Sequence, residues 1–288
     1  MRTVELVPGI KSSALGFGCA PILGSVDCAA ARRALAVALD HGVTHFDVAR
    51  SYGYGDAEGF LGRYLQARRG QVVLATKFGI VATLHARFLR PLKPLVRWAK
   101  KLQKPAPSHE QPGQRQLSLI SPPTLGDRFH ERVAMVPANL RASVEKSLRE
   151  LRTDYLDYLL LHEPRDAIGA MHATVEEVVL LKREGKIRAW GLAFKRDLRP
   201  SPAVGGPEFD VLQYDLSPGG PGYDRVRNER AEAANILFSP FGGAVPGVPR
   251  SEILTRLACD FPRSVVLCTM FNPEHIRANA RVFHAPYC

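Results

Sequence analysis

Short apolar runs alternate along the chain with longer segments in which apolar residues recur every three or four positions. The short runs are typical of buried strands, and the longer segments are typical of amphipathic helices. Strands are expected at residues 14–19, 44–47, 72–77, 155–162, 189–192, 211–214, 236–239 and 264–268. Helices are expected at residues 28–41, 57–66, 137–151, 174–184, 224–234, 251–258 and 273–282.

This alternation predicts the fold class. Strands that alternate with helices favour a parallel sheet, and eight such units favour a closed (β/α)₈ barrel of the TIM type over an open sheet. The repeat is weakest at residues 199–207, where a helix belongs but Pro and Gly are frequent. We therefore expect one barrel domain over residues 1–288, with its active site at the C-terminal rim.

Several expected helix ends have a local cause. Asp27 and Asp56 each precede a helical pattern, where an acidic side chain can accept hydrogen bonds from free backbone N–H groups. Gly42 and Gly185 follow helical patterns, where glycine tolerates the left-handed backbone that ends many helices.

A long basic insertion interrupts the alternation after the third strand. Residues 80–136 separate Lys77 from the next expected helix, and residues 87–104 carry many Lys and Arg side chains but no acid. One reading is a solvated basic face. The other is a lid that attracts an anionic substrate or cofactor phosphates, because loops that follow barrel strands surround the active site.

Composition and charge narrow the class of protein. The chain has 288 residues, 45% of them hydrophobic, and contains no apolar run of about 18 residues that would span a membrane. Its first residues lack the apolar stretch of a secretion signal, so a cytoplasmic protein is expected. The net charge of +11 is compatible with nucleic-acid binding, but no recognition motif accompanies it. An anionic ligand or a generally basic protein explains the charge equally well, and no nucleic-acid partner is expected.

The five cysteines are odd in number, scattered and without a CxxC pair. This pattern favours reduced, mostly packed thiols over a disulfide framework or a zinc site. No metal site is expected.

Four polar residues stand at or just after the ends of expected strands: Asp47, Tyr52, Lys77 and His162. A cation such as Lys77 stabilises a nearby phenolate and lowers the pKa of tyrosine from its usual value of about 10. Asp47 can hold Lys77 as an ammonium, and His162 can donate a hydrogen bond that orients a carbonyl oxygen. Such a set can protonate a developing alkoxide, while the hydride must come from a reduced nicotinamide.

Each of these residues also has a structural alternative. A Lys–Asp pair at strand ends is often structural, a histidine after three leucines is often a satisfied core group, and Tyr54 competes with Tyr52 for the role of acid. The set is informative because all four residues fall at one edge of the same expected sheet.

Three sequence segments resemble signatures of the aldo-keto reductase superfamily, in its bacterial-type members. The first resembles G-x-x-x-F-D-T-A-x-x-Y-G…E…L-G and comprises Gly42–Ala49, Tyr52-Gly53, Glu58 and Leu61-Gly62. The second resembles D-Y-[IL]-D…H-x-P and runs from Asp154 to Pro164. The third, Gly185–Gly191, resembles G-K-I-R-x-[IL]-G.

The resemblance implies a (β/α)₈ barrel that reduces aldehydes or ketones with NADPH, with NADH as the alternative. It implies that Tyr52 is the general acid, that Lys77 and Asp47 tune it, and that His162 orients the carbonyl. The implied cofactor contacts are Gly18, Cys19, Asp47, Gln213, Ser239, Pro240, Phe241, Gly242, Thr269, Met270, His275 and Asn279.

Two departures from the family pattern concern the cofactor. Ala193-Phe194 stand where the family usually has Ser-Asn to hold the carboxamide, and His275 replaces a common arginine at the 2′-phosphate. These departures leave both NADPH and NADH as candidate cofactors. They also allow an alternative function, that of a non-catalytic nucleotide-binding sensor or partner subunit. The expected partner is a small-molecule carbonyl substrate, with an anionic compound as one candidate. The sequence does not identify the substrate or the oligomeric state.

Overall fold

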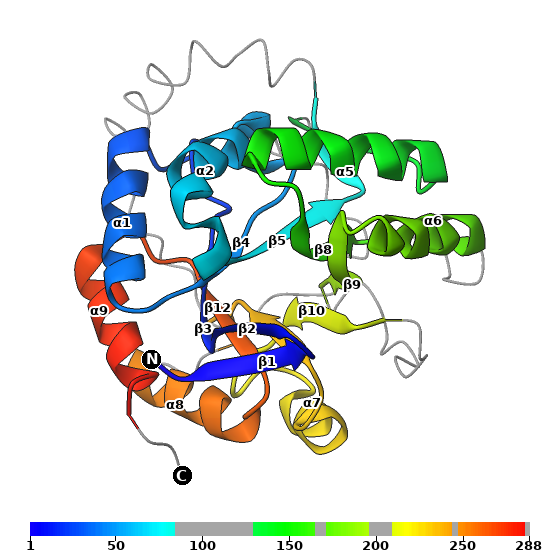
Figure 1. Cartoon of the computed structure of the whole chain (residues 1–288). Coiled ribbons are helices and arrows are strands. Elements are labelled where there is room, and N and C mark those ends of the chain that lie inside the picture. The colour runs from blue at the N-terminus through cyan, green and yellow to red at the C-terminus, as the bar shows by residue number, and fades with distance from the viewer. Residues whose placement is uncertain (84–128, 165–170, 196–208, 244–246, 286–288) are drawn as a thin grey trace.

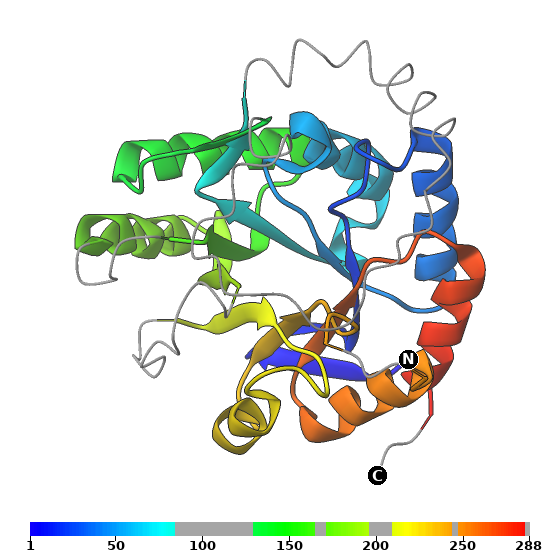
Figure 2. The same cartoon turned by 180° about the vertical axis from the view of Figure 1, so that it is seen from behind.

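The computed structural model is a closed barrel of eight parallel strands surrounded by helices (Figures 1 and 2). It describes residues 1–83, 129–164, 171–195, 209–243 and 247–285. Each barrel strand pairs with its neighbours in chain order, and the last pairs with the first. The strands are β3 (Leu15–Gly18), β4 (His45–Asp47), β5 (Val73–Phe78), β8 (Leu156–His162), β9 (Ile187–Phe194), β10 (Val211–Asp215), β11 (Asn235–Phe238) and β12 (Val265–Cys268).

These are the eight strands expected from the apolar runs, with ends displaced by a few residues. The seven expected helices are confirmed as well. They are α1 (Cys28–Asp40), α2 (Ala57–Leu65), α5 (Pro137–Leu151), α6 (His172–Arg183), α7 (Tyr223–Arg230), α8 (Arg250–Asp260) and α9 (Pro273–Val282). Residues 199–207, where the alternation is weakest, lie outside the described residues.

An N-terminal hairpin, which was not among the expected strands, covers the end of the barrel where the strands begin. It consists of β1 (Thr3–Val7) and β2 (Ile10–Ser13), which pair antiparallel. The backbone N–H of Ser13 donates to the Thr44 hydroxyl at 2.8 Å, just before β4 begins. Arg188, at the start of β9, donates to the Gly9 carbonyl at 2.7 Å. The hairpin therefore closes the end where the strands start and leaves the opposite rim open.

A second hairpin borders that opposite rim. Strands β6 (Ile80–Ala82) and β7 (His130–Arg132) pair antiparallel, and the N–H of Thr83 donates to the Phe129 carbonyl at 3.0 Å. The two described ends of the predicted insertion, residues 80–136, are thus held side by side. Its basic segment, residues 87–104, lies outside the described residues.

The predicted helix ends are confirmed in three of four cases. Asp27 accepts a 2.8 Å hydrogen bond from the N–H of Ala30 and caps α1. Gly42 and Gly185 have positive φ angles of 78° and 73°. The prediction for Asp56 was wrong: its backbone is helical and not extended like that of Asp27, and its side chain forms no cap hydrogen bond with α2.

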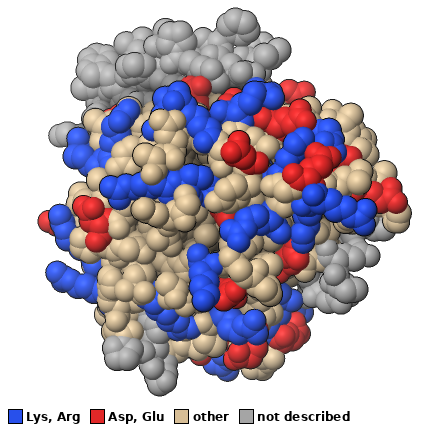
Figure 3. All heavy atoms as spheres, in the orientation of Figure 1, with Lys and Arg blue, Asp and Glu red and all other residues tan. Residues whose placement is uncertain are grey.

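Thiol state and surface charge bear on the expected class of protein. Cys19, Cys28 and Cys268 are free, whereas Cys259 is disulfide-bonded, so the expectation of reduced thiols was wrong at that position. Basic and acidic side chains of the described residues are interspersed on the face shown in Figure 3. Among the described residues, no helix is long and apolar enough to cross a membrane.

Candidate active site

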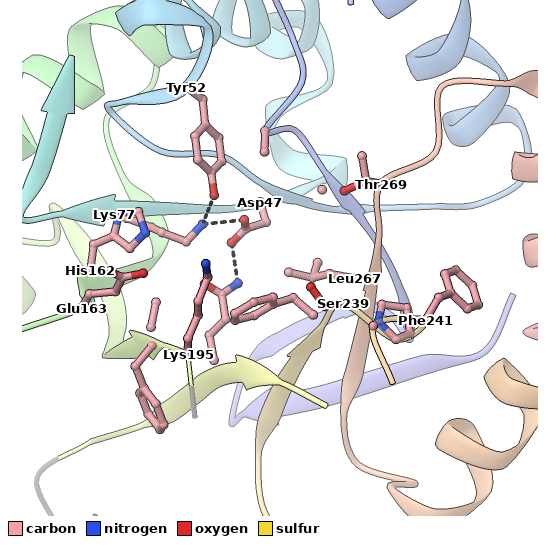
Figure 4. Close-up of a pocket in the computed structure, with 18 residues that line it drawn as sticks. Asp47, Tyr52, Lys77, His162, Glu163, Lys195, Ser239, Phe241, Leu267 and Thr269 are labelled. Atoms are coloured by element: carbon pink, nitrogen blue, oxygen red, sulfur yellow. Dashed lines mark hydrogen bonds and ion pairs between the residues drawn. The ribbon is translucent and has the colours of Figure 1, made fainter. Parts of the chain in front are cut away.

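The ends of the barrel strands bring Asp47, Tyr52, Lys77 and His162 to one cavity of about 450 Å³. Figure 4 shows these side chains converging from β4, the turn after it, β5 and β8. Because the carboxyl ends of parallel strands meet at one rim, residues far apart in the sequence share this space. The expectation that the four residues occupy one edge is therefore confirmed by the geometry.

Three of them form a continuous polar chain. The Nζ of Lys77 donates to Oδ1 of Asp47 at 2.5 Å and lies 3.4 Å from the Oη of Tyr52. A further bond at 3.2 Å reaches the carbonyl of Val48. Lys77 and Asp47 are both buried, so their charges are retained by pairing with one another.

The second oxygen of Asp47 has a partner from across the barrel. The Nε2 of Gln213, on β10, donates to Oδ2 of Asp47 at 2.7 Å. Both carboxylate oxygens are thus occupied, one by Lys77 and one by Gln213. This arrangement fixes the orientation of Asp47 and, through it, that of the ammonium.

The backbone of the turn after β4 separates Tyr52 from its competitor Tyr54. Gly53 and Tyr54 both have φ near 59°, in the short 3₁₀ turn Tyr52–Gly55. This left-handed turn directs Tyr52 toward Lys77. The Tyr54 ring instead packs edge-on against the Phe129 ring, with 5.7 Å between the ring centroids. A side chain at Gly53 would collide with the carbonyl of Ile22, so only glycine allows this turn.

The pKa of Tyr52 does not follow the expectation that a neighbouring lysine lowers it. Burial raises the pKa of Tyr52 above its usual value, and the opposing effect of Lys77 does not cancel it. Burial lowers the pKa of Lys77, but Asp47 and Tyr52 outweigh it and the net pKa is raised. At neutral pH the site therefore holds a protonated phenol next to a charged ammonium.

His162 lies at the end of β8 and lines the same cavity. Burial, assisted by Lys77, lowers its pKa to about 3. Its Nδ1 is buried without a hydrogen-bond partner among the described residues. The ring is thus a neutral imidazole that can donate one hydrogen bond to a ligand.

Most of the residues implied as cofactor contacts line the cavity, but four do not. Gly18, Asp47, Gln213, Thr269 and the turn Ser239–Gly242 lie in its wall. Cys19 and Met270 are buried in the packed core, His275 is exposed on α9, and Asn279 donates to the sulfur of Met270 at 3.6 Å. The wall thus includes predicted cofactor contacts at the ends of β3, β4, β10, β11 and β12. It does not include Cys19, Met270, His275 or Asn279.

The wall also contains residues that sequence reasoning did not select as site residues: Ala20, Glu163, Ala193, Phe194, Lys195, Phe238 and Leu267. Three of them, Ala20, Glu163 and Phe238, directly follow or precede a selected residue, which was the available signal. Their direction could not be read because side chains alternate along a strand, and loop residues follow no fixed period.

The cavity is large enough for a small ligand. Its volume of about 450 Å³ falls in the usual range of ligand pockets, about 300–1,000 Å³. A Cβ at Gly18 would lie 3.1 Å from Oγ1 of Thr269, so glycine keeps this part open. Ser239 and Glu163 have positive φ angles of 53° and 47°, a strained backbone that often occurs at binding sites.

Comparison with known proteins matches the aldo/keto reductase family model to residues 14–200. The uncharacterized oxidoreductase YcsN of Bacillus subtilis is 31% identical over 162 residues, which are 55% of this chain and 41% of that protein. The aldo-keto reductase YhdN of the same species is 27% identical over 64% of this chain and 44% of its own length. The chain thus spans less than half the length of these two curated relatives.

Solved structures share the fold. An aldo-keto reductase from Bacillus halodurans in its holo form superposes with a TM-score of 0.69 at 20% identity, covering 100% of this chain and 92% of that one. An aldo-keto reductase from Klebsiella pneumoniae, solved in complex with NADPH, gives a TM-score of 0.65 at 19% identity, covering 99% and 90%. At these identities the likeness concerns the barrel alone.

Proposed function

The chain belongs to the aldo/keto reductase family, and we propose that it reduces an aldehyde or ketone to an alcohol with NADPH or NADH. The observation that carries this proposal is the continuous chain from Gln213 through Asp47 and Lys77 to Tyr52, in the same cavity as His162. A phenol, an ammonium and a neutral imidazole around one cavity suit a carbonyl group that is becoming an alkoxide.

The roles follow from the protonation states. His162 donates a hydrogen bond to the carbonyl oxygen and orients it. Tyr52 donates its proton to that oxygen, and Lys77 stabilises the phenolate that remains. A reduced nicotinamide held by the cavity wall would supply the hydride to the carbonyl carbon. Water then returns a proton to Tyr52, which completes the cycle.

The cofactor would be held at β3, β10 and the turn after β11. This part of the cavity wall is lined by Gly18, Thr269 and the turn Ser239–Gly242. A 2.9 Å hydrogen bond from the N–H of Gly242 to the Ser239 carbonyl closes the turn. Because His275 stands where the family commonly has an arginine for the 2′-phosphate and does not line the cavity, the difference in affinity between NADPH and NADH should be small.

Substitution of Tyr52 tests this function, with Tyr54 as a matched control. Tyr52→Phe removes only the acidic hydroxyl and should lower reduction of a reactive aldehyde by about 10²–10⁴-fold, while titration by nicotinamide fluorescence shows unchanged binding. Tyr54→Phe should leave turnover near the wild-type rate. Unchanged turnover in Tyr52→Phe would refute the assignment of the acid.

A sensor that binds nucleotide without catalysis is the second candidate. Ala193 and Phe194 line the cavity where the family usually has Ser-Asn, and the Phe194 ring stacks on Tyr214 at 6.0 Å. Neither side chain can hold a carboxamide by hydrogen bonds. Tight binding of NADPH or NADH without oxidation by any member of an aldehyde panel would favour the sensor. The panel should include polyhydroxylated carbonyl compounds, because one relative is a D-threo-aldose 1-dehydrogenase of Pseudomonas, 26% identical over 71% of this chain.

A further inference from the structure

We propose that Lys195 selects a carbonyl substrate that carries a carboxylate. This inference rests on the proposed reductase function and adds the chemical class of the substrate. It comes from one cavity-lining cation that has no carboxylate partner among the described residues, and from the position of that cation beside His162.

Strand register places Lys195 close to the carbonyl-orienting histidine. His162, at the end of β8, pairs with Ala193 on β9, and the N–H of Glu163 donates to the Ala193 carbonyl at 2.7 Å. Lys195 follows two residues later and lines the cavity. Its charge also contributes to lowering the pKa of His162, as expected for two groups on one side of the site.

The other charges in the cavity wall are already paired. Lys77 is bonded to Asp47 at 2.5 Å. Glu163 is bonded to Arg132, which lies on β7, at 2.9 Å. Lys195 is exposed to the cavity and has no carboxylate partner within the part of the chain that the structure describes.

The consequence is an attractive potential for an anion at one place in the wall. A neutral substrate gains nothing from this potential, whereas a negatively charged group within a few ångströms gains a favourable interaction.

The position of Lys195 favours the substrate over the cofactor as the source of that anion. In the barrel, β9, which precedes Lys195, is next to β8, which ends at His162. Strands β11 and β12 lie two and three strands away from β9 on its other side. Three of the residues proposed to hold the cofactor, Ser239, Phe241 and Thr269, follow the ends of β11 and β12. Figure 4 shows them on the side of the cavity away from Lys195 and Glu163.

The size of the charge favours a carboxylate. A lysine ammonium is a compact single charge without the fork of donors that arginine uses for phosphate. One unpaired ammonium therefore matches one carboxylate, while a phosphate dianion would need further donors. The expected substrates are small aldehydes or ketones with a carboxylate on the side opposite the hydride donor.

A matched pair of substrates tests the proposal. We would measure kcat/KM for 4-carboxybenzaldehyde and for its neutral methyl ester, methyl 4-formylbenzoate, with saturating cofactor. In the wild-type protein the ratio of acid to ester should exceed one and should fall as ionic strength rises. Lys195→Met should lower this ratio about tenfold, mainly through the KM of the acid. Lys195→Arg should largely retain the ratio, and Lys195→Glu should invert it.

Lys11→Met provides the control for a general change in protein charge. Lys11 is 74% exposed on the N-terminal hairpin, at the closed end of the barrel, and its replacement should leave the ratio unchanged. If the wild-type protein reduces both aldehydes and the ratio is the same in Lys195→Met, the proposal for Lys195 is refuted while the reductase function stands. If the wild-type protein reduces neither aldehyde nor any other carbonyl compound, the proposed function itself fails.

Discussion

Gln213 donates a 2.7 Å hydrogen bond to the one oxygen of Asp47 that Lys77 leaves free. The two residues are 166 positions apart in the chain, on strands β10 and β4. Asp47 is buried at the centre of the acid–base chain and is held from both sides. Gln213 therefore belongs to the proposed catalytic arrangement as a positioning residue as well as to the cofactor wall.

Replacement of this amide should weaken catalysis. In Gln213→Leu, Oδ2 of Asp47 loses its partner and the carboxylate is free to rotate away from Lys77. A lost hydrogen bond to a buried charged group costs about 1.5–3 kcal/mol, so kcat should fall about 10- to 100-fold. Gln66→Leu, at an exposed glutamine on the outer surface, is the control and should keep the wild-type kcat. A Gln213→Leu enzyme with unchanged kcat would show that Lys77 alone fixes Asp47.

The buried pair of Lys77 and Asp47 should dominate the stability of the site. Lys77→Met leaves a buried carboxylate without its cation, which typically destabilises a protein by about 3–5 kcal/mol. The double variant Lys77→Met/Asp47→Asn removes both charges and should recover part of that loss, although activity stays low in both. Urea unfolding measures the difference. Equal stability of the single and double variants would contradict charge pairing as the cause.

The pH dependence of reduction should reflect Tyr52 and not His162. Burial holds the pKa of His162 at about 3, so the imidazole is neutral at every pH above that value and causes no inflection near its ordinary value of about 6.5. The pKa of Tyr52 is raised, so the phenol keeps its proton through neutral pH. The rate should therefore be flat from about pH 6 to 9 and fall only as the pH rises past about 10. A bell-shaped profile with a limb near pH 6.5 would contradict this assignment.

Close packing at Gly191 should make this position intolerant of any side chain. A Cβ there would overlap the carbonyl oxygen of Val211 on the neighbouring strand β10. Gly191→Ala should force β9 and β10 apart and destabilise the protein by about 1–3 kcal/mol or more, seen as a lower thermal midpoint. Gly70→Ala is the matched control, because its Cβ would meet no atom within 4 Å. A Gly191→Ala protein as stable as the control would show that the strands can separate without loss.

The strand ends explain why much of the site could be predicted from the sequence. Asp47, Lys77 and His162 each follow a short apolar run, and parallel strands bring such positions to one rim of a barrel. The closing hairpin Thr3–Ser13 was not predicted, although Val4 and Leu6 alternate with polar residues in its first strand and Pro8-Gly9 precedes its second. Cys19, Met270 and Asn279 lie near the site in sequence, but their side chains turn into the packed core.

What the sequence by itself determined is the barrel, its eight strands and the group of polar residues at their ends, because apolar periodicity and strand–helix alternation are local properties. The tertiary structure decided the remainder. It brought Tyr52 rather than Tyr54 next to Lys77 through a left-handed turn and joined Gln213 to Asp47 across the barrel. It also placed Lys195 in the same cavity as His162, without a carboxylate partner among the described residues. These relationships depend on the direction of side chains and on contacts between distant segments, and such contacts exist only once the barrel has closed.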